Sequence, residues 1–426
     1  MDITALYDLF RQSRGVSTDT RTLKAGELFF TLSGENFDGN RFIEQALEKG
    51  AHAVVADGEA LPKHPAVYRV PDALRALQEL ARHHRRQFSI PFIALTGSNG
   101  KTTSKELLVS VLAQKYRVHA TQGNLNNHIG VPLTLLRLSG TAEIAVIEMG
   151  ANHVGDIAEL CRIAEPTHGA ITNIGTAHIE GFGGQMGVLK GKTELYDFLE
   201  THHGQIFMPS YDPLLAQKAD QYSNIVRWGK PEDFSYYELK ESEPSIVYLD
   251  EQQQEVKAQL FGAYNFRNIQ LALAIGKWFE VPLPAAHHAV AGYTSDNNRS
   301  QIIRRDKQTF VLDAYNANPS SMEAALRSFA RTPAQERVAI LGDMLELGDI
   351  TAEKHRAIRE LALELPIHQV IFCGQHFTEV CLPSDRCFPT PKALKDYLSD
   401  NPLPAEAHIL LKGSRKVQLE QLVSAY

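Results

Sequence analysis

One short segment restricts the fold of this 426-residue chain more than any other. Residues 96–103 read Thr-Gly-Ser-Asn-Gly-Lys-Thr-Thr, after an apolar run at 92–95 and before a helix-like stretch at 104–114. A glycine-rich turn between a strand and a helix lets backbone N–H groups close around phosphate oxygens, and the helix N-terminus adds partial positive charge. The segment therefore predicts a strand–loop–helix unit of a parallel α/β sheet, with a nucleoside triphosphate bound at the loop.

Two side chains in the loop have the chemistry to hold ATP and its metal ion. Lys101 supplies a point charge for the phosphates, and Thr102 supplies a hydroxyl for Mg²⁺. Leu95 stands where the full Gly-x4-Gly-Lys-Thr pattern has its first glycine, so a glycine turn beside an incidental lysine is the alternative. The predicted phosphate-binding residues are Gly97, Ser98, Asn99, Gly100, Lys101, Thr102 and Thr103.

Length and pattern divide the chain into three α/β domains. At the usual ~150 residues per domain, 426 residues make about three. We predict a small α/β domain over 1–87, a central P-loop ATPase-like domain with a parallel sheet over 88–296, and a doubly wound, Rossmann-like domain over 297–426. The first boundary follows a helix predicted at 72–86, and the second lies in a predicted loop at 282–299 that contains Pro, Gly and Asn.

Strand-like and helix-like segments alternate in the second and third domains, as they do in parallel sheets covered by helices. Asn318 and Pro319 have the residue types of the N-cap and first position of a helix. The predicted strands are 27–32, 51–56, 66–70, 92–95, 144–148, 170–173, 310–312, 338–341, 370–373 and 409–411, and the predicted helices include 42–49, 72–86, 104–114, 154–163 and 265–279.

Composition excludes several classes of protein. A net charge of −7 lacks the basic excess that duplex DNA or anionic membranes attract, so we expect no nucleic-acid partner. The longest apolar runs are far shorter than the ~20 residues of a membrane helix, and the N-terminus lacks the basic and apolar segments of a signal peptide. The four cysteines form no Cys-x-x-Cys pair, which predicts neither a zinc site nor disulfides and fits a cytoplasmic protein with reduced thiols.

Two polar strand ends should share a crevice with the phosphate loop. Glu148 ends the apolar run 144–147, and a carboxylate in that position is costly unless a cation neutralises it. We therefore predict that Glu148 binds Mg²⁺, with a solvated acid at the strand end as the alternative. His178 follows the predicted strand 170–173 and enters the same crevice, so we regard it as a candidate ligand.

Three polar strand ends predict a ligand-facing edge in the third domain as well. Asp313, Asp343 and Lys412 each come at the end of an apolar strand, and Arg415 follows Lys412 closely. Lys412 and Arg415 would pair with a carboxylate. Asn316, near Asp313, reads equally well as a ligand contact or as a turn residue.

These motifs come in the order found in the Mur ligases, and the chain resembles that family over its whole length. The segments that carry the resemblance are 96–103, 148–151, 173–178, 265–268, 313–322 and 412–415. Within the family, residues 315–322 (Tyr-Asn-Ala-Asn-Pro-Ser-Ser-Met) and 342–348 resemble the branch that adds D-alanyl-D-alanine to UDP-N-acetylmuramoyl-tripeptide. The Asp-Asn-Pro-Arg signature of the branch that adds the third residue of the peptide is absent from the sequence.

The resemblance implies an ATP-dependent amide ligase of peptidoglycan precursor synthesis. ATP would phosphorylate the terminal carboxylate of the nucleotide-linked tripeptide. The amine of D-alanyl-D-alanine would then attack the acyl phosphate to give an amide, ADP and phosphate. Lys101 and Mg²⁺, of which the family uses two ions, would absorb charge on the transferred phosphoryl group. We expect the third domain to close on the site by rotation, and we expect a monomer.

The resemblance also assigns roles that spacing alone does not give. Thr102 and Glu148 match ligands of the Mg²⁺ on ATP, whereas His178 and Lys192 match positions at the second Mg²⁺. By composition Lys192 is an ordinary surface lysine, but the family carries this lysine as a carbamate, which requires burial to lower its pKa. The predicted catalytic residues are Lys101, His178, Lys192 and Asn316; those extending the ATP site are Asn265, Asn268, Arg299 and Asp313; and those binding substrate are Asp19, Thr20, Arg21, Ser33, Gly34, Asn126, Asn127, Asp343, Lys412 and Arg415.

Three positions depart from the family pattern, and two other functions stay open. Tyr264 stands where histidine is frequent, Asn298 replaces a common glycine, and His128 replaces a common acid. A related amide ligase, such as one extending folate with glutamate or one adding the third residue of the peptide, is one alternative. A nucleotide-binding switch without ligation is the other. The sequence also leaves open whether the tripeptide ends in diaminopimelate or lysine.

Overall fold

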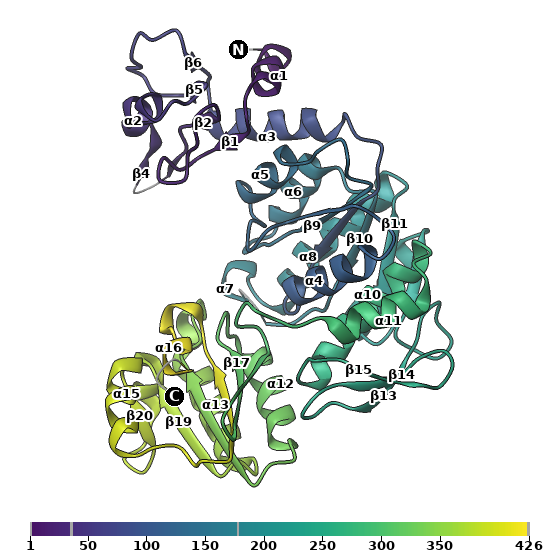
Figure 1. The fold of residues 1–426 in the computed structure, drawn as a ribbon, viewed down its shortest axis with the longest axis vertical. Coiled ribbons are helices and arrows are strands. Elements are labelled where there is room, and N and C mark those ends of the chain that lie inside the picture. The colour runs from purple at the N-terminus through teal and green to yellow at the C-terminus, as the bar shows by residue number, and fades with distance from the viewer. Residues whose placement is uncertain (1, 35–36, 177–178, 424–426) are drawn as a thin grey trace.

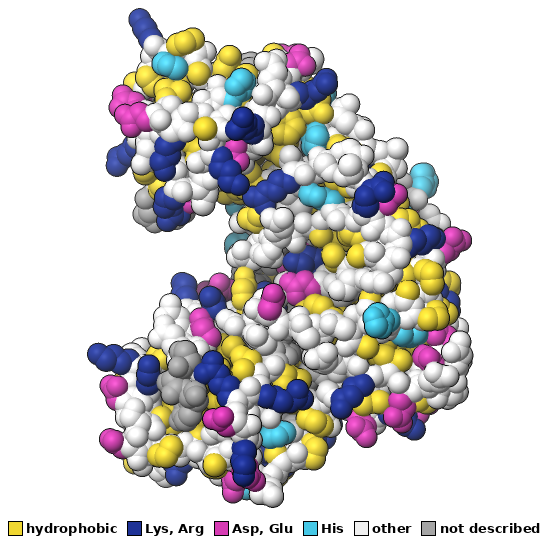
Figure 2. Space-filling model, in the orientation of Figure 1, with side chains coloured by type: hydrophobic (Ala, Val, Ile, Leu, Met, Phe, Trp, Pro, Cys, Tyr) yellow, Lys and Arg dark blue, Asp and Glu magenta, His cyan; other side chains and the backbone are white. Residues whose placement is uncertain are grey.

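The computed structural model describes residues 2–34, 37–176 and 179–423. Three α/β lobes follow one another along a curve, with the central lobe joining the other two (Figure 1). Figure 2 shows open space between the first and third lobes on this face. The predicted three-domain α/β fold is confirmed. Among the described helices, none combines the length and the apolar character needed to cross a membrane.

The first lobe is built on a small parallel sheet. Its elements are α1 (Ile3–Gln12), β1 (Val16–Ser17), β2 (Leu28–Phe30), β3 (Ser33–Gly34), β4 (Phe37–Asp38), η1 (Gly39–Phe42), α2 (Ile43–Glu48), β5 (Ala53–Ala56), β6 (Val67–Arg69) and α3 (Ala73–Arg85). The sheet order is β1-β2-β5-β6, and β2 and β5 are completely buried. Asp72 caps α3 by accepting a hydrogen bond from the Arg75 N–H, and the buried face of α3 includes Leu77 and Leu80. The helix predicted at 72–86 is therefore confirmed.

The central lobe contains a six-stranded parallel sheet of order β12-β11-β10-β7-β9-β8. Its elements are β7 (Phe92–Thr96), α4 (Lys101–Leu112), β8 (Val118–Ala120), α5 (Gly130–Leu136), β9 (Ile144–Glu148), α6 (Asp156–Ala164), β10 (His168–Ile171), α7 (Ile179–Phe182), α8 (Gln185–Thr201), β11 (Gln205–Pro209), α9 (Pro213–Ala216), η2 (Ala219–Gln221), β12 (Ile225–Trp228) and α10 (Ala263–Trp278). Because β7 pairs with both β9 and β10, the loops that follow these three strands lie at one edge of the sheet. A separate antiparallel sheet of β13 (Glu238–Glu241), β14 (Val247–Leu249) and β15 (Glu255–Lys257) was not foreseen from the sequence.

The loop predicted at 282–299 is partly wrong. Residues Leu283–Gly292 form a helix, α11, which packs against α4. Pro284 occupies the first turn, where a proline is tolerated because the first N–H groups of a helix have no intrahelical partner. Ala286, Ala289 and Val290 supply the buried face. The prolines and glycine that suggested a loop are therefore the ends of a short apolar helix.

The third lobe has a six-stranded sheet of order β16-β17-β21-β18-β19-β20, in which only the β16–β17 pairing is antiparallel. Its elements are β16 (Gln301–Arg305), β17 (Gln308–Asp313), α12 (Pro319–Ala330), β18 (Glu336–Gly342), η3 (Gly348–Ile350), α13 (Thr351–Glu364), β19 (Gln369–Cys373), α14 (Gln375–Val380), β20 (Arg386–Phe388), α15 (Pro391–Asp400), β21 (Ala407–Lys412), η4 (Arg415–Val417) and α16 (Glu420–Val423). Asn318 and Ser321 form a reciprocal capping box around Pro319, as the sequence predicted for this helix start. The parallel strands β17, β21 and β18 thus end at the same edge of the sheet.

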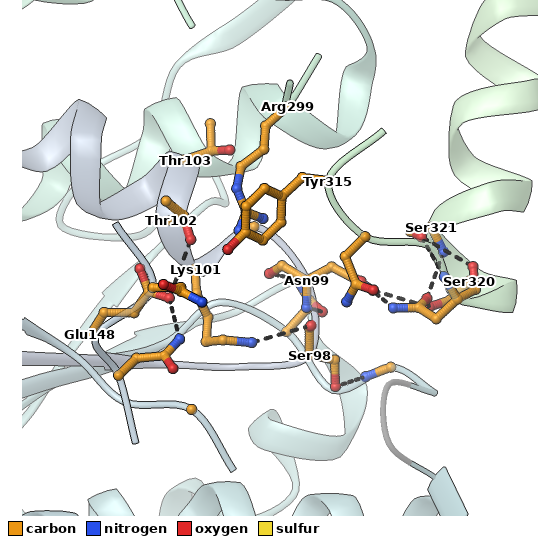
Figure 3. Close-up of a pocket in the computed structure, with 18 of the residues that line it drawn as sticks. Ser98, Asn99, Lys101, Thr102, Thr103, Glu148, Arg299, Tyr315, Ser320 and Ser321 are labelled. Carbon is orange, nitrogen blue, oxygen red and sulfur yellow. Dashed lines mark hydrogen bonds between the residues drawn. The ribbon is translucent and has the colours of Figure 1, made fainter. Parts of the chain in front are cut away.

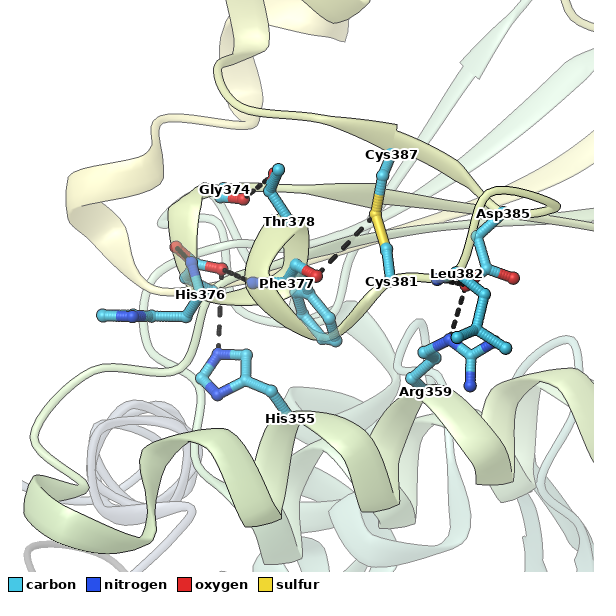
Figure 4. The surroundings of a disulfide bond; sticks show 11 residues. His355, Arg359, Gly374, His376, Phe377, Thr378, Cys381, Leu382, Asp385 and Cys387 are labelled. Atoms are coloured by element: carbon cyan, nitrogen blue, oxygen red, sulfur yellow. Dashed lines mark hydrogen bonds and ion pairs between the residues drawn. A yellow bond between two sulfur atoms is a disulfide. The ribbon is translucent and has the colours of Figure 1, made fainter.

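The expectation that the chain has no disulfide is wrong for Cys381 and Cys387, which are bonded (Figure 4). Their Cα atoms lie 6.6 Å apart, within the range a disulfide spans. Asp385, in the turn between them, is paired with Arg359 of α13 and accepts a hydrogen bond from the Leu382 N–H at 2.6 Å. This turn brings β20 beside the end of α14, a proximity that spacing rules for Cys-x-x-Cys pairs do not detect. Cys161 and Cys373 are buried free thiols.

Candidate active site

The phosphate loop joins β7 to α4 through two glycines with backbone angles that other residues rarely adopt. Gly100 has φ +80° and forms the N-cap of α4. Gly97 has φ +141°, and a Cβ atom there would lie 2.0 Å from Thr172 Oγ1. Lys101 Nζ donates to the Gly97 carbonyl at 2.7 Å, so the amine folds back over the loop. Burial lowers the pKa of the Lys101 amine, while the charge of Glu148 opposes the shift.

The loop is held in shape by the residues that follow β10. Thr172 Oγ1 and Asn173 Nδ2 donate to the Asn99 carbonyl at 2.6 and 2.9 Å, and Asn173 Oδ1 accepts from the Asn99 N–H at 3.1 Å. Ser98 Oγ accepts from the Gly175 N–H at 2.9 Å. The predicted strand 170–173 ends at Ile171 because Thr172 and Asn173 turn toward the loop. The phosphate cradle is therefore fixed by a neighbouring strand before any ligand enters.

Glu148 lies beside Thr102, as predicted from its position at the end of β9. Its Oε1 accepts from Thr102 Oγ1 at 3.2 Å and from Asn126 Nδ2 at 2.7 Å. The side chain is 1% exposed, and Oε2 has no hydrogen-bond partner among the described residues. A buried carboxylate oxygen that accepts no hydrogen bond from the described residues, next to a hydroxyl, fits the oxygen-rich coordination of Mg²⁺. Within residues 2–34, 37–176 and 179–423, no cluster of three His, Cys, Asp or Glu side chains forms a metal site; His178 lies outside the described residues.

Two buried asparagines connect α10 to the phosphate-loop helix. Asn268 Oδ1 accepts from Ser104 Oγ at 3.0 Å, and Asn268 Nδ2 donates to Asn265 Oδ1 at 2.9 Å. The Tyr264 hydroxyl, on the residue just before Asn265, is hydrogen-bonded to Ser300 Oγ at 2.9 Å. Burial, reinforced by Asp313, raises the pKa of the Tyr264 phenol well above its usual range. Both asparagines therefore lie beside the loop at which the sequence predicts a nucleotide.

The third lobe contributes a charged group to the same place. Lys412 Nζ, at the end of β21, is paired with Asp313 Oδ2 at 2.6 Å, and the Lys412 side chain is only 2% exposed. The Arg299 guanidinium lies over the Tyr315 ring, 3.7 Å from its centroid (Figure 3). Arg299 Nε is buried and has no hydrogen-bond partner among the described residues. A cationic group with an unused donor faces the loop from the opposite side.

Direct hydrogen bonds join the phosphate loop to the third lobe. Asn99 Oδ1 accepts from Asn318 Nδ2 at 2.8 Å, and Asn99 Nδ2 donates to Ser320 Oγ at 3.0 Å. In Figure 3, Ser320 and Ser321 approach from the start of α12 on one side, and Asn99 meets them from the other. The two lobes therefore enclose a cavity of about 690 Å³. The predicted residues that line it are Ser98, Asn99, Gly100, Lys101, Thr102, Thr103, Asn126, Asn127, Glu148, Asn265, Asn268, Arg299, Asp313, Asn316 and Lys412.

Comparison with known families agrees with this arrangement along the whole chain. The Mur ligase family, catalytic domain, matches residues 12–85. The Mur ligase middle domain matches residues 95–276, and the Mur ligase, glutamate ligase domain, matches residues 298–414. The chain is 34% identical to a Bacillus subtilis (strain 168) protein over 427 residues, covering 96% of this chain and 92% of the relative. This chain is a Mur ligase.

Two curated relatives of this chain are named for the same activity. The Bacillus subtilis relative is named UDP-N-acetylmuramoyl-tripeptide–D-alanyl-D-alanine ligase. The Escherichia coli (strain K12) protein of the same name is 34% identical, over 96% of this chain and 93% of its own length. Among solved structures, MurF from Acinetobacter baumannii has a TM-score of 0.87 at 30% identity, covering 99% of this chain and 97% of that one. MurF from Thermotoga maritima in complex with ADP has a TM-score of 0.86 at 27% identity, covering 98% and 97%.

In this Mur ligase Lys192 is a buried residue of α8, not the surface lysine that composition suggests. The side chain is 1% exposed, and Nζ donates only weakly, to the Ala151 carbonyl at 3.4 Å. The Phe182 ring centroid lies 5.1 Å from Nζ. Burial, with the charge of Lys101, holds the pKa of the Lys192 amine well below its usual range. Burial thus favours the neutral form of this amine, which is the form that a carbamate requires.

Other predicted residues of the Mur ligase lie away from the cavity. Asp19 and Arg21 form an exposed pair in the first lobe, where Thr20 donates to Gln45 and Ser33 and Gly34 form the exposed β3. Asp343 accepts hydrogen bonds from the N–H groups of His376 and Phe377, so its carboxylate caps the start of α14. Arg415 is paired with Glu420 at 2.8 Å. The sequence placed Asp343 and Arg415 at the correct edge of the sheet, but both side chains are bonded within the third lobe.

Several lining residues of the Mur ligase cavity were not assigned a role from the sequence, among them Arg267 and Tyr315. Arg267, between Asn265 and Asn268, lines the cavity with its guanidinium 4.3 Å from the Tyr211 ring centroid. Tyr315 lines the cavity, and its ring stacks against the Arg299 guanidinium. Both lie inside motifs that were identified, and an arginine in the first turns of a helix next to a phosphate loop was a usable signal. The stacking partner of each arginine comes from a distant segment.

Proposed function

We propose that this Mur ligase joins D-alanyl-D-alanine to UDP-N-acetylmuramoyl-tripeptide in peptidoglycan precursor synthesis, using ATP through an acyl phosphate. The observation that carries the proposal is the cavity in which the phosphate loop faces Arg299, Asp313 and Lys412 of the third lobe. Relatives with this activity in their names align with 96% of the chain. A carboxylate is a poor electrophile, so ATP must first convert one oxygen into a leaving group.

Different residues along the cavity bind different parts of ATP. The N–H groups at the start of α4 and the Lys101 amine bind the phosphates and stabilise charge as the phosphoryl group moves. Asn265 and Asn268 bind on the adenine side, and Arg299 and Asp313 on the side of the ribose and phosphates. Asn316, which also lines the cavity, lies close to the reacting phosphoryl group. Together these contacts hold the tripeptide carboxylate in line with the phosphate and exclude water.

Thr102 and Glu148 would hold Mg²⁺, because Glu148 Oε2 is buried and accepts no hydrogen bond from the described residues, while Glu148 Oε1 lies beside the Thr102 hydroxyl. When bound there, the ion supplies positive charge to the phosphates of ATP. His178 and a carbamate on Lys192 would serve a second ion, by resemblance to the family. The proposed substrate-binding residues are Asp19, Thr20, Arg21, Ser33 and Gly34 for the uridine nucleotide, and Asn126, Asn127, Asp343, Lys412 and Arg415 for the peptide substrates.

The carbamate on Lys192 has its own test. The neutral amine would add CO₂ to form an N-carboxylate and release one proton. We expect Lys192→Ala to lower turnover by about 10²-fold, the scale of removing one charge-stabilising group, and chloride or a short-chain acid to restore part of it. Lys190→Ala, an exposed neighbour on α8, is the matched control and should change turnover little. Full activity of Lys192→Ala, or a loss that no added anion reduces, would contradict the carbamate.

The ligase reaction is tested by phosphate release from ATP with Mg²⁺, UDP-N-acetylmuramoyl-tripeptide and D-alanyl-D-alanine, omitting each component in turn. We expect release only when all are present, and a product heavier than the tripeptide substrate by one dipeptide minus water. A nucleotide switch would hydrolyse or hold ATP without either precursor. A folate-extending ligase would release phosphate only with folate and glutamate. We further propose a monomer that works in the cytoplasm, where ATP is supplied.

A further inference from the structure

The chain between the central and third lobes is attached to the phosphate-loop helix by one carboxylate. Glu106 lies on α4, just over one turn after Lys101. Its Oε2 accepts from the Tyr293 hydroxyl at 2.6 Å, and both of its oxygens accept from Asn297 Nδ2, at 2.8 and 2.9 Å. Tyr293 directly follows α11, and Asn297 precedes β16. These contacts hold the interdomain linker, residues 293–300, against the helix that begins at the phosphate loop.

The linker leads directly to Arg299. Asn298 and Ser300, on either side of it, have φ of +59° and +50°, a region that non-glycine residues adopt only when their surroundings impose it. The Ser300 N–H donates to Asp313 Oδ1 at 3.2 Å, and the Arg299 guanidinium lies over the Tyr315 ring inside the cavity. The place of Arg299 is therefore set by a constrained backbone that is attached to the central lobe on both sides, through Asn297 and Glu106 before it and through Ser300 and Tyr264 after it.

A buried lysine orients the anchoring carboxylate. Lys105 Nζ lies 3.9 Å from Glu106 Oε1 and 3.9 Å from Glu148 Oε2, and its side chain is 4% exposed. Nζ also donates to the Gly123 carbonyl at 3.4 Å. One positive charge between two carboxylates attracts both and restricts the rotamers that Glu106 can adopt. Glu106 itself is absent from the lining of the cavity, so its effect on a nucleotide must pass through the linker.

We propose that Glu106 is a positioning residue, which sets Arg299 in the nucleotide cavity by holding the interdomain linker on α4. The inference rests on the proposed use of the cavity for ATP. The contact between Glu106 and Asn297 fixes the position of Arg299 relative to a nucleotide bound on the loop. When this anchor is absent, the Ser300–Tyr264 hydrogen bond still ties the backbone beside Arg299 to the central lobe, but residues 293–298 can move away from α4 and shift the guanidinium while the phosphate loop stays in place.

The test is a mutant cycle measured as ADP affinity by calorimetry with Mg²⁺, using the full chain. We expect Glu106→Ala and Asn297→Ala each to weaken ADP binding about tenfold, and Glu106→Gln to weaken it less because one oxygen can still accept from Tyr293. In an Arg299→Ala background, Glu106→Ala should cause no further loss, since both changes remove the same contact. Glu280→Ala, which removes an exposed carboxylate paired with Lys115 just beyond the other end of α4, is the matched control and should leave affinity unchanged.

Two results would overturn the inference: unchanged ADP affinity in Glu106→Ala, or a tenfold loss that persists in the Arg299→Ala background. If Glu106→Ala does not fold, Asn297→Ala and Tyr293→Phe break the anchor from the linker side and decide the same question. Failure of the ligase proposal is a separate result, in which the wild-type chain binds ADP but releases no phosphate with the two precursors. The ADP cycle needs neither precursor and stays decisive in that case.

Discussion

The phosphate loop and the predicted uridine-nucleotide site of the first lobe hold their side chains in opposite ways. Around the loop, Glu148 and Lys192 are each 1% exposed, and Asn99 is bonded both to the strand-end residues after β10 and to α12 of another lobe. In the first lobe, Arg21 is 88% exposed and its charged partner is Asp19, two residues away. The loop is held by segments far apart in the sequence, whereas the Asp19–Arg21 pair of the first lobe is made within a local turn.

This difference distinguishes two ways in which a binding site can obtain its binding free energy. Groups that are already fixed and desolvated act on the transition state without reorganising, so their loss lowers kcat. Exposed groups on a local turn must be ordered by the ligand itself, so their loss weakens binding and raises KM. The comparison predicts that substitutions in the two lobes give different kinetic signatures.

The largest expected effect tests the fixed side of the comparison. Lys101→Ala should lower turnover by at least ~10²-fold, the scale of removing one donor that stabilises transition-state charge. The measurement is steady-state phosphate release with both precursors at saturation. Lys115→Ala, just beyond the opposite end of α4, should leave turnover near the wild-type value. Turnover of Lys101→Ala within a few-fold of wild type would contradict the view that preorganised groups at the phosphate loop stabilise the transition state.

The next effect tests the exposed side. Arg21→Ala should raise the KM for the UDP-linked substrate about tenfold, the scale of losing a hydrogen bond to a charged group, with kcat little changed. Arg11→Ala, an exposed arginine on α1 of the same lobe, is the control and should change neither constant. A fall in kcat with an unchanged KM would show that the first lobe is as preorganised as the loop.

The smallest effect concerns the attachment of the first lobe to the central lobe. His84 on α3 donates from Nε2 to the Leu138 carbonyl at 3.1 Å, and its Nδ1 accepts from the Tyr7 hydroxyl at 3.2 Å. Burial, opposed by the Leu138 carbonyl, lowers the pKa of His84. Below the ordinary histidine pKa of ~6.5 the unfolded chain takes up a proton that the folded chain resists, so stability falls as the pH drops through that value.

We expect this contribution to appear in melting temperatures. Between pH 7.5 and pH 5.5, the wild-type Tm should fall by about 2 °C more than that of His84→Gln, which cannot take up the proton. His64→Gln, at an exposed position of the same lobe, should keep the wild-type pH dependence. Parallel pH profiles for wild type and His84→Gln would show that His84 does not contribute to the pH dependence of stability.

The sequence predicted best those parts of the site that depend on adjacent residues. The phosphate loop, Glu148 at its strand end and the Asn318–Pro319 helix start follow from local geometry and chemistry, and the structure confirms each. Lys192 could not be identified from pattern, because its burial depends on how α8 packs. The helix α11 was missed because its prolines and glycine resemble those of a loop, although it has a buried face.

Long-range partners were beyond the reach of sequence patterns. The Cys381–Cys387 bond depends on a turn held by Arg359, and the contact of Glu106 with Asn297 joins residues 191 positions apart. Asp343 was placed at the correct edge, but only the structure reveals that the start of α14 uses its carboxylate. In each case the residue type was informative, whereas its partner came from another element.

The position of β21 has a consequence for how the enzyme is made. This strand lies between β17 and β18, yet it is the last of the sheet to be synthesised. A ribosome adds roughly 5–20 residues per second and makes β17, β18, β19 and β20 before β21, so the nascent third lobe lacks its central strand until then. Lys412, the partner of Asp313, arrives on that strand. The nucleotide site can therefore assemble only when translation of the third lobe is nearly complete, long after the phosphate loop itself has emerged.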